Sequence, residues 1–159
     1  MDRKRGIERK LNLIADILPQ VSQVFLDTAP LIYYLERSVN FFPIVDRFFQ
    51  GLKSSNIPAV VSPITLAECL VMPFKLNDIQ MQQNYINFLT NTREIEMVGI
   101  NTEIARTAAE LRATYRLKLP DALQVATAIA SGCDGFLTND TDLKRVRELQ
   151  ILVVEELEV

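Results

Sequence analysis

The chain has 159 residues, of which 48% are hydrophobic and 23% charged, with a formal net charge of −3. This length and composition predict a single globular domain with an ordinary core. The net negative charge disfavours a protein that binds nucleic acid strongly and without sequence preference. No apolar run reaches the roughly 18 residues of a membrane helix. The sequence has no histidine, which excludes Ser-His-Asp catalysis, Cys-His catalysis and mixed Cys/His zinc sites. Carboxylates are therefore the expected means of any chemistry, and their oxygens favour Mg²⁺ or Mn²⁺.

Residues 1–20 form a charged stretch with an apolar repeat. Its apolar residues recur at helical spacing: Ile7, Leu11, Ile14 and Leu18. We predict an amphipathic helical extension, either packed on the flank of the domain or serving as a basic arm for a partner or nucleic acid. The stretch lacks the uninterrupted apolar segment of a signal peptide, which predicts a cytoplasmic protein. Residues 21–159 are expected to form the domain itself.

Short apolar runs then alternate with helical patterns along the chain. The predicted strands lie near 23–27, 57–62, 94–100, 132–138 (after a turn) and 151–154. The predicted helices lie near 29–37, 42–54, 64–70, 78–92, 102–115 and 119–130, with a short basic helix after residue 143. Pro73 is expected to end the third of these helices. Such alternation predicts a three-layer α/β/α sandwich with a central, mainly parallel sheet of about five strands.

Four acidic residues fall at the carboxyl ends of strands or at the starts of the helices that follow. Asp27 and Asp140 end strands, whereas Glu68 and Asp121 lie in the first turns of helices. In an open parallel sheet these positions share the edge at which ligands bind. Each acid alone has an ordinary alternative as a helix cap or as a partner of the helix dipole. Four acids at one edge, in a chain without histidine, favour a metal pocket over four independent caps.

The segments around these acids also carry a family resemblance. They are Phe25-Leu26-Asp27-Thr28, Ser62-Pro63-Ile64-Thr65-Leu66-Ala67-Glu68, Leu119-Pro120-Asp121-Ala122 and Phe136-Leu137-Thr138-Asn139-Asp140. In this order they resemble the PIN-domain family, particularly its single-domain VapC-type toxin ribonucleases. The resemblance covers residues 23–154 and implies an endoribonuclease that uses Mg²⁺ or Mn²⁺. It implies that the metal is bound by the four acids, Asp27, Glu68, Asp121 and Asp140, with Asp142 as a fifth candidate.

Further expectations surround this acidic pocket. The resemblance implies an antitoxin partner that inserts an Arg or Lys among the acids, and a homodimer. Thr28, Thr138 and Asn139 are candidates to support the ligating carboxylates, although strand-end hydroxyls also bond the backbone. Five basic residues are candidate contacts for RNA phosphates, although solvated helix faces explain each one singly: Arg112, Arg116, Lys118, Lys144 and Arg145.

Two other functions compete with the ribonuclease. A PIN-like binding scaffold without turnover should lack one or more of the acids, and all four are present. Aspartyl phosphotransfer also uses an Asp at the end of the first strand, as Asp27 does. However, a phosphatase of the haloacid dehalogenase type needs a second Asp two positions later, where Ala29 stands. A receiver domain needs a Lys directly after a late strand, where the sequence has Thr138-Asn139-Asp140.

Overall fold

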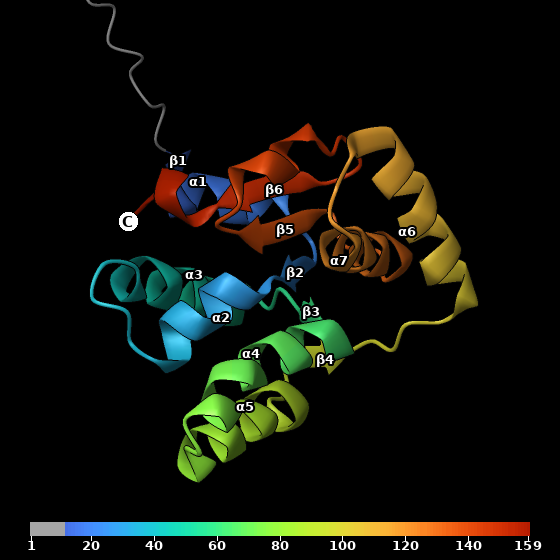
Figure 1. The fold of residues 1–159 in the computed structure, drawn as a ribbon. Coiled ribbons are helices and arrows are strands. Elements are labelled where there is room, and N and C mark those ends of the chain that lie inside the picture. The colour runs from blue at the N-terminus through green and yellow to red at the C-terminus, as the bar shows by residue number, and fades with distance from the viewer. Residues whose placement is uncertain (1–11) are drawn as a thin grey trace, which may run out of the picture.

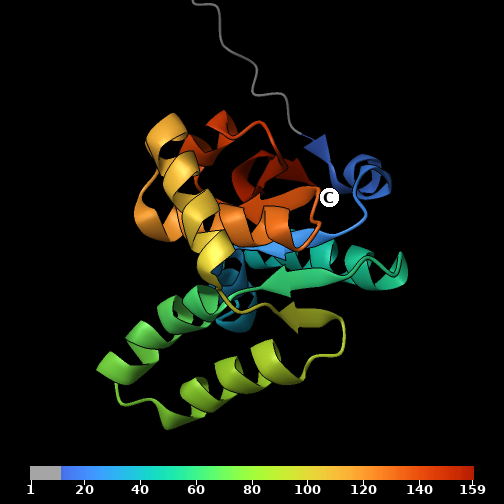
Figure 2. The ribbon, with the colours of Figure 1, turned by 90° about the vertical axis from the view of Figure 1, so that its right-hand side faces the viewer.

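A five-stranded sheet forms the middle layer of the protein, which is described here by a computed structural model over residues 12–159 (Figures 1 and 2). Its strands are β2 (Val24–Leu26), β3 (Ala59–Val61), β4 (Ile95–Met97), β5 (Gly135–Thr138) and β6 (Gln150–Val153). All four pairings are parallel, and the strand order is β4-β3-β2-β5-β6. The predicted α/β sandwich with a parallel sheet of five strands is confirmed.

Helices cover both faces of this sheet, which explains why its three central strands are buried throughout. One face is covered by α6 (Thr102–Tyr115) and α7 (Leu119–Ala130), and the other by α2 (Thr28–Leu35), α3 (Phe42–Ser54), α4 (Pro63–Lys75) and α5 (Ile79–Asn91). Successive side chains of β2 point to opposite faces of the sheet. Phe25 packs beneath α6 and α7 and stacks on Phe136 with ring centroids 5.0 Å apart, whereas Val24 and Leu26 face the other layer. No helix within residues 12–159 has the length and apolarity to cross a bilayer.

Helix α4 continues through Pro73, so the prediction that this proline ends the helix is wrong. Proline removes one backbone hydrogen bond from a helix, but Pro73 is buried, and its packing holds the helix for a further half turn. Beyond it, the Leu76 N–H donates to the Met72 carbonyl at 3.0 Å. The carbonyl of Pro73 accepts from the Asp78 N–H at 2.9 Å and so leads the chain into α5.

Residues 12–20 do not continue a single helix, and that part of the prediction for 1–20 is wrong. β1 (Asn12–Leu13) pairs in parallel with β7 (Leu157–Glu158), and α1 (Ile14–Ile17) and the 3-10 turn η1 (Leu18–Gln20) follow. The reason is packing, because the apolar repeat turns into the core: Ile14, Ile17 and Leu18 are all buried there. Residues 1–11 of the predicted helix lie outside the described residues, and a domain boundary at residue 21 stays a prediction.

Candidate acidic site

Strands β2 and β5 are neighbours at the centre of the sheet, where the direction of strand order reverses. In open α/β sheets, ligands bind beyond the carboxyl ends of the strands at this point. Asp27 directly follows β2, and Asp140 lies two residues beyond the end of β5. The Asp27 N–H donates to the Leu137 carbonyl of β5 at 2.9 Å. The fold thus brings together two acids that stand far apart in the sequence.

Asp27 is half-buried and caps the N-terminus of α2. Its Oδ1 accepts from the Thr28 N–H, and its Oδ2 accepts from the Thr138 hydroxyl, both at 2.8 Å. Burial raises the pKa of Asp27, the two hydrogen bonds lower it, and the charges of Glu68 and Asp140 raise it again, so that the pKa is raised on balance. The carboxylate is held in place while its charged form is disfavoured, and a nearby cation would relieve that penalty.

Glu68 and Asp121 reach the same region from α4 and from the first turn of α7. The Thr28 hydroxyl donates to Glu68 Oε1 at 3.3 Å. Burial raises the pKa of Glu68, with a further contribution from the charge of Asp121, against the lowering effect of the Thr28 hydrogen bond. Burial likewise raises the pKa of Asp121, followed by the charges of Asp27 and Asp140. The four predicted acids therefore lie within electrostatic reach of one another.

Asp142 lies in the turn η2 (Thr141–Arg145), and Asp140 directly precedes it. Asp140 is the N-cap of that turn, and its Oδ1 accepts from the Asp142 N–H at 2.9 Å. Asp142 is exposed, and its charge makes the smallest of the contributions that raise the pKa of Asp121. Asp142 therefore stands at the rim of the acidic group, and its part as a ligand stays a prediction.

The three predicted supporting residues make different contacts. The hydroxyls of Thr28 and Thr138 each donate to a carboxylate of the acidic group, as their prediction requires. Asn139 instead donates from Nδ2 to the Tyr33 hydroxyl at 3.0 Å and accepts at Oδ1 from the Glu155 N–H at 3.1 Å. Its amide therefore connects α2 to the segment after β6. Neither of these two hydrogen bonds is made to a carboxylate, so the predicted support of a ligating carboxylate by Asn139 stays a prediction.

A buried polar link between α4 and α7 was missed by sequence reasoning. Gln124 Nε2 donates to Thr65 Oγ1 at 2.7 Å, and the Ser62 hydroxyl donates to Gln124 Oε1. All three side chains are at most 1% exposed. Gln124 lies one turn after Asp121, and Thr65 one turn before Glu68, so the link fixes the two helices that carry these acids. A glutamine within the apolar run Ala122–Ala126 was the signal that could have revealed it.

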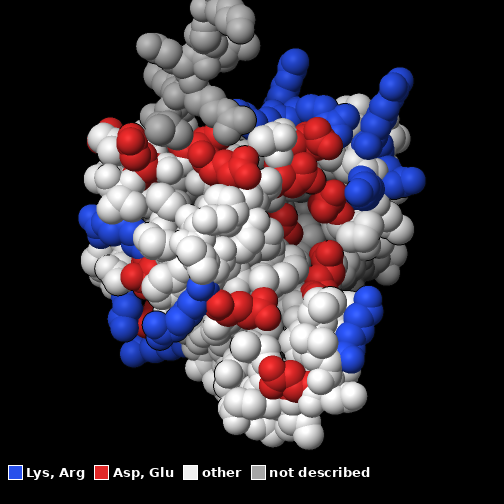
Figure 3. Space-filling view, turned by 60° about the vertical axis from the view of Figure 1, so that its left-hand side comes forward, with Lys and Arg blue, Asp and Glu red and all other residues white. Residues whose placement is uncertain are grey.

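Asp and Glu side chains surround a hollow on the face shown in Figure 3. Within the described part of the chain, no three acidic or cysteine side chains are close enough to form a ready-made metal site. The donor chemistry nonetheless fits a hard cation, because the groups that converge here are carboxylates and hydroxyls. A divalent ion at this place requires the carboxylates to close on it by side-chain rotation.

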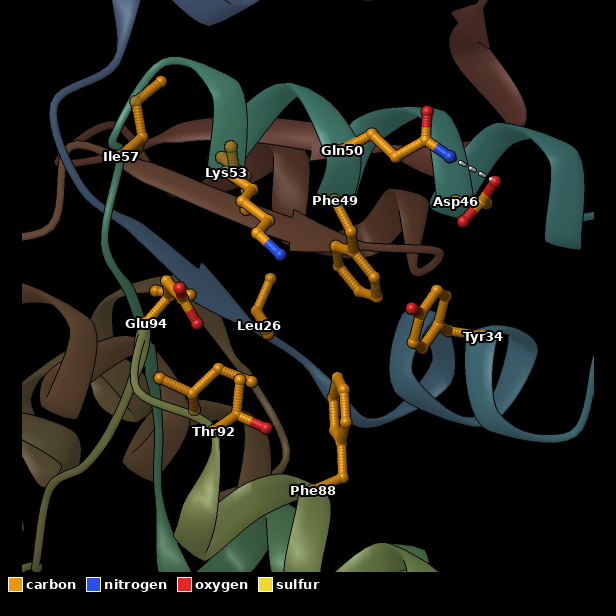
Figure 4. Close-up of a pocket in the computed structure, with 13 residues that line it drawn as sticks. Leu26, Tyr34, Asp46, Phe49, Gln50, Lys53, Ile57, Phe88, Thr92 and Glu94 are labelled. Atoms are coloured by element: carbon orange, nitrogen blue, oxygen red, sulfur yellow. Dashed lines mark hydrogen bonds between the residues drawn. The ribbon is translucent and has the colours of Figure 1, made fainter.

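A cavity lies elsewhere in the described chain (Figure 4). Its volume is about 340 Å³, and it opens between α3 and α5 above β2 and β4. Phe49 and Phe88 form its apolar walls, and Lys53 and Glu94 stand at its rim. None of the four acids lines it. Its walls suit apolar groups and not phosphate chemistry, so the candidate site remains the group of four acids at the carboxyl ends of β2 and β5.

Comparison with known proteins gives a consistent picture. The model of the PIN domain family matches residues 24–149. VapBC2 from Rickettsia felis, solved with a promoter DNA fragment, is 20% identical with a TM-score of 0.65, over 82% of this chain and 98% of that one. A toxin-antitoxin complex from Klebsiella pneumoniae is 24% identical with a TM-score of 0.63, over 82% of this chain and 97% of that one. VapC20 from Mycobacterium tuberculosis, a toxin that cleaves the Sarcin-Ricin loop, is 14% identical with a TM-score of 0.64, over 80% of this chain and 98% of that one. A comparison with curated proteins found no match. At these identities the structural likeness is one of fold.

Proposed function

Because the chain belongs to the PIN domain family, as its four motifs predict, we propose that it is a Mg²⁺- or Mn²⁺-dependent endoribonuclease. One observation carries the proposal: Asp27 at the cap of α2, Glu68 in α4 and Asp121 in α7 stand on three different elements, and the pKa of each is raised by burial and by the charge of another carboxylate. Acids that only cap separate helices have no reason to lie close enough to raise one another's pKa. Acids crowded in this way suit a divalent ion, and a phosphodiester bound through that ion.

In this proposal the chain's own residues orient the reaction. When bound, Mg²⁺ or Mn²⁺ lowers the pKa of a water molecule and stabilises negative charge on the phosphoryl oxygens. Asp27 accepts one hydrogen bond at each oxygen, from Thr28 and from Thr138, and each oxygen keeps a second lone pair for the ion. Asp121, in the first turn of α7, would accept the proton of the attacking water. The water oxygen bonds to phosphorus, the bond from phosphorus to the leaving oxygen breaks, and that oxygen takes up a proton.

We also propose that the protein is the toxin of a toxin–antitoxin pair. Solved structures with its fold include toxin–antitoxin assemblies from Rickettsia felis and Klebsiella pneumoniae. An Arg or Lys of the antitoxin, inserted among the acids, would neutralise them by charge-assisted hydrogen bonds. The proposal includes a homodimer, an expectation of the family, and a cytoplasmic place of action, where RNA and an antitoxin are made.

A direct assay tests the enzymatic proposal. The full chain is incubated with assorted RNAs in Mg²⁺ or Mn²⁺, beside Asp121→Ala and a sample in EDTA. We expect cleavage by the wild type alone, and only with the metal present. Cleavage that persists in EDTA or in Asp121→Ala would contradict the proposal, because it would have to come from another site or another protein.

A second candidate is a PIN-like binding scaffold without turnover. The observation in its favour is that no three acids within residues 12–159 stand close enough to hold an ion without rearrangement. The two candidates differ in their response to metal. A scaffold neither cleaves RNA nor changes its melting temperature (Tm) in millimolar Mn²⁺, whereas an enzyme that binds the ion in its folded state is stabilised by it.

A further inference from the structure

Half of the basic residues in the described chain gather in two short segments. Twelve Lys and Arg residues occur between 12 and 159, and six of them lie in 112–118 and 144–147. These six are called the basic face: Arg112, Arg116, Lys118, Lys144, Arg145 and Arg147. All six are exposed. Such a concentration stands out in a chain whose net charge is −3.

The two segments form one surface. Tyr115, at the end of α6, donates from its hydroxyl to Glu148 at 3.0 Å, and the same oxygen accepts from the Arg147 N–H at 3.4 Å. Between the segments lies an open hollow of about 590 Å³, lined by Thr114 and Tyr115 on one side and by Lys144, Arg145 and Arg147 on the other. A second hollow, of about 420 Å³, is lined by the other three members of the basic face together with Leu117: Arg112, Arg116 and Lys118.

The charges of this surface are available to a ligand. Within residues 12–159, Lys144 is the only member of the basic face in an ion pair, with Glu156 at 2.7 Å. Arg112 and Arg145 each donate to a backbone carbonyl, of Leu117 at 2.8 Å and of Asp142 at 3.0 Å. Those bonds orient the guanidinium groups without neutralising them, and each group keeps donors free for a second acceptor.

The basic face begins where the acidic site ends. Lys118 is the N-cap residue of α7 and stands three residues before Asp121 in the first turn of that helix. Arg145 belongs to the same short turn as Asp142. Lys and Arg side chains stand beside the acid-lined hollow in Figure 3. A polyanion that reaches the acids must overcome their repulsion, and the adjoining cations, of which only Lys144 is in an ion pair within residues 12–159, supply the compensating attraction.

We propose that the basic face binds the phosphodiester backbone of single-stranded RNA on one side of the acidic site. This inference rests on the proposed ribonuclease function, and it assigns the path by which the strand leaves the scissile bond. The open hollow suits a flexible strand, because its walls present separate cations and one half-buried aromatic ring, the combination that holds single strands through phosphates and stacking.

The test measures binding without turnover. A fluorescein-labelled 12-nucleotide RNA is titrated with the full chain in EDTA, anisotropy is followed at several salt concentrations, and a gel confirms that the RNA stays intact. Arg145→Ala/Arg147→Ala should weaken binding about tenfold and reduce the slope of log K against log salt by about 1.4, since each phosphate contact to a single strand contributes about 0.7. The matched control is Arg47→Ala/Arg93→Ala, which removes two exposed arginines elsewhere and should leave Kd and slope unchanged.

The outcomes separate this inference from the proposed function. Equal weakening of RNA binding in both double variants, or no weakening in Arg145→Ala/Arg147→Ala, would overturn the inference. If Arg145→Ala/Arg147→Ala binds RNA as the wild type does, an acidic protein segment becomes the expected ligand of the basic face. If cleavage is metal-dependent and lost in Asp121→Ala while the arginine pair has no effect on RNA binding, only the basic face is wrong. If no cleavage is found but the arginine pair alone weakens RNA binding, the basic face stands and the nuclease proposal fails.

Discussion

Asp27→Asn removes one negative charge from the acidic site while keeping the shape and contacts of the side chain. The asparagine Oδ1 can accept from the Thr28 N–H as the carboxylate does, and Asn caps helices about as well as Asp. Its Nδ2 can donate to Thr138 Oγ1, because a hydroxyl rotates and has two lone pairs, one of which already accepts from the Asp140 N–H at 3.1 Å. The substitution therefore tests the charge of Asp27 almost alone.

The expected effect is a gain in stability of the metal-free protein. Burial is the largest cause of the raised pKa of Asp27, and the like charges of Glu68 and Asp140 add to it. At an effective dielectric constant of about 20 and an assumed separation of about 8 Å, each neighbouring carboxylate repels Asp27 by about 2 kcal/mol, or about 4 kcal/mol for the two. Weakening two charge-assisted hydrogen bonds to neutral ones costs about 1 kcal/mol each. The difference, reduced because the site is only half-buried, is a net gain of about 1–2 kcal/mol at neutral pH. For a protein of this size, Tm then rises by about 2–8 °C.

The pH dependence follows from the raised pKa of Asp27. A raised folded-state pKa means that the charged form destabilises the folded protein, so metal-free wild type loses stability as pH rises from about 4 to that folded-state value. Asp27→Asn should lose less over the same range, and its advantage should therefore grow with pH. Chemical denaturation in EDTA at pH values between 4 and 8 measures both effects.

The control is Asp78→Asn, at the N-cap of α5, where Oδ1 accepts from the Met81 N–H at 3.0 Å. Asp78 is exposed and does not belong to the acidic site, so this variant should be neutral or slightly destabilised through the helix dipole. If Asp27→Asn were destabilised by about 1 kcal/mol at neutral pH, or its advantage shrank as pH rose, Asp27 would be an ordinary cap and the reasoning would be wrong.

Two further predictions concern the frame around the site. Gln124→Met should destabilise the protein by about 2 kcal/mol in urea denaturation, because a side chain of similar size loses two buried hydrogen bonds; unchanged stability would refute the link. Burial acts to raise the pKa of Asp134, but hydrogen bonds from the Ser22 N–H, the Gln23 N–H and the Ser22 hydroxyl outweigh it and lower the pKa. Asp134→Asn should therefore cost about 1 kcal/mol at neutral pH, discounted for exposure. That gap should close as pH falls below about 4; a gap that widened on acidification would contradict the assignment.

Much of the fold could be predicted because its elements are locally consistent. Three helices begin and end where their patterns predict: 42–54, 102–115 and 119–130. Pro43 and Pro120 stand in the first turns of two of them, where proline is tolerated. The parallel sheet follows from alternation alone. What could not be predicted depends on tertiary packing, since neither the burial of Pro73 nor the pairing of β1 with β7 leaves a local pattern.

The acids of the site could be predicted as a group, but not their separation. Strand ends and helix starts fix the edge at which Asp27, Glu68, Asp121 and Asp140 lie, because that edge is a property of parallel topology. The distances between their side chains depend on rotamers and on Gln124, which reaches from α7 to the cap of α4. Hydroxyl contacts with the acids were predictable for Thr28 and Thr138, because both stand at the edge of the sheet that the acids share, although each donates to an acid far away in the sequence. The contacts of Asn139 were not, because its partners lie on two other elements.

The balance between repulsion and metal binding is what separates an enzyme from a scaffold in this fold. Burial and like charges disfavour the ionised acids by an amount comparable with the 1–2 kcal/mol expected for Asp27→Asn. A ligand present at 100 times its Kd stabilises the folded state by about 2.7 kcal/mol, so a bound ion would more than offset that penalty. Millimolar Mn²⁺ should therefore raise the Tm of wild type and have little effect on Asp27→Asn, which has already lost the charge that the ion would neutralise. An equal rise in both proteins would mean that the ion binds elsewhere, and that the crowded acids are tolerated for another reason.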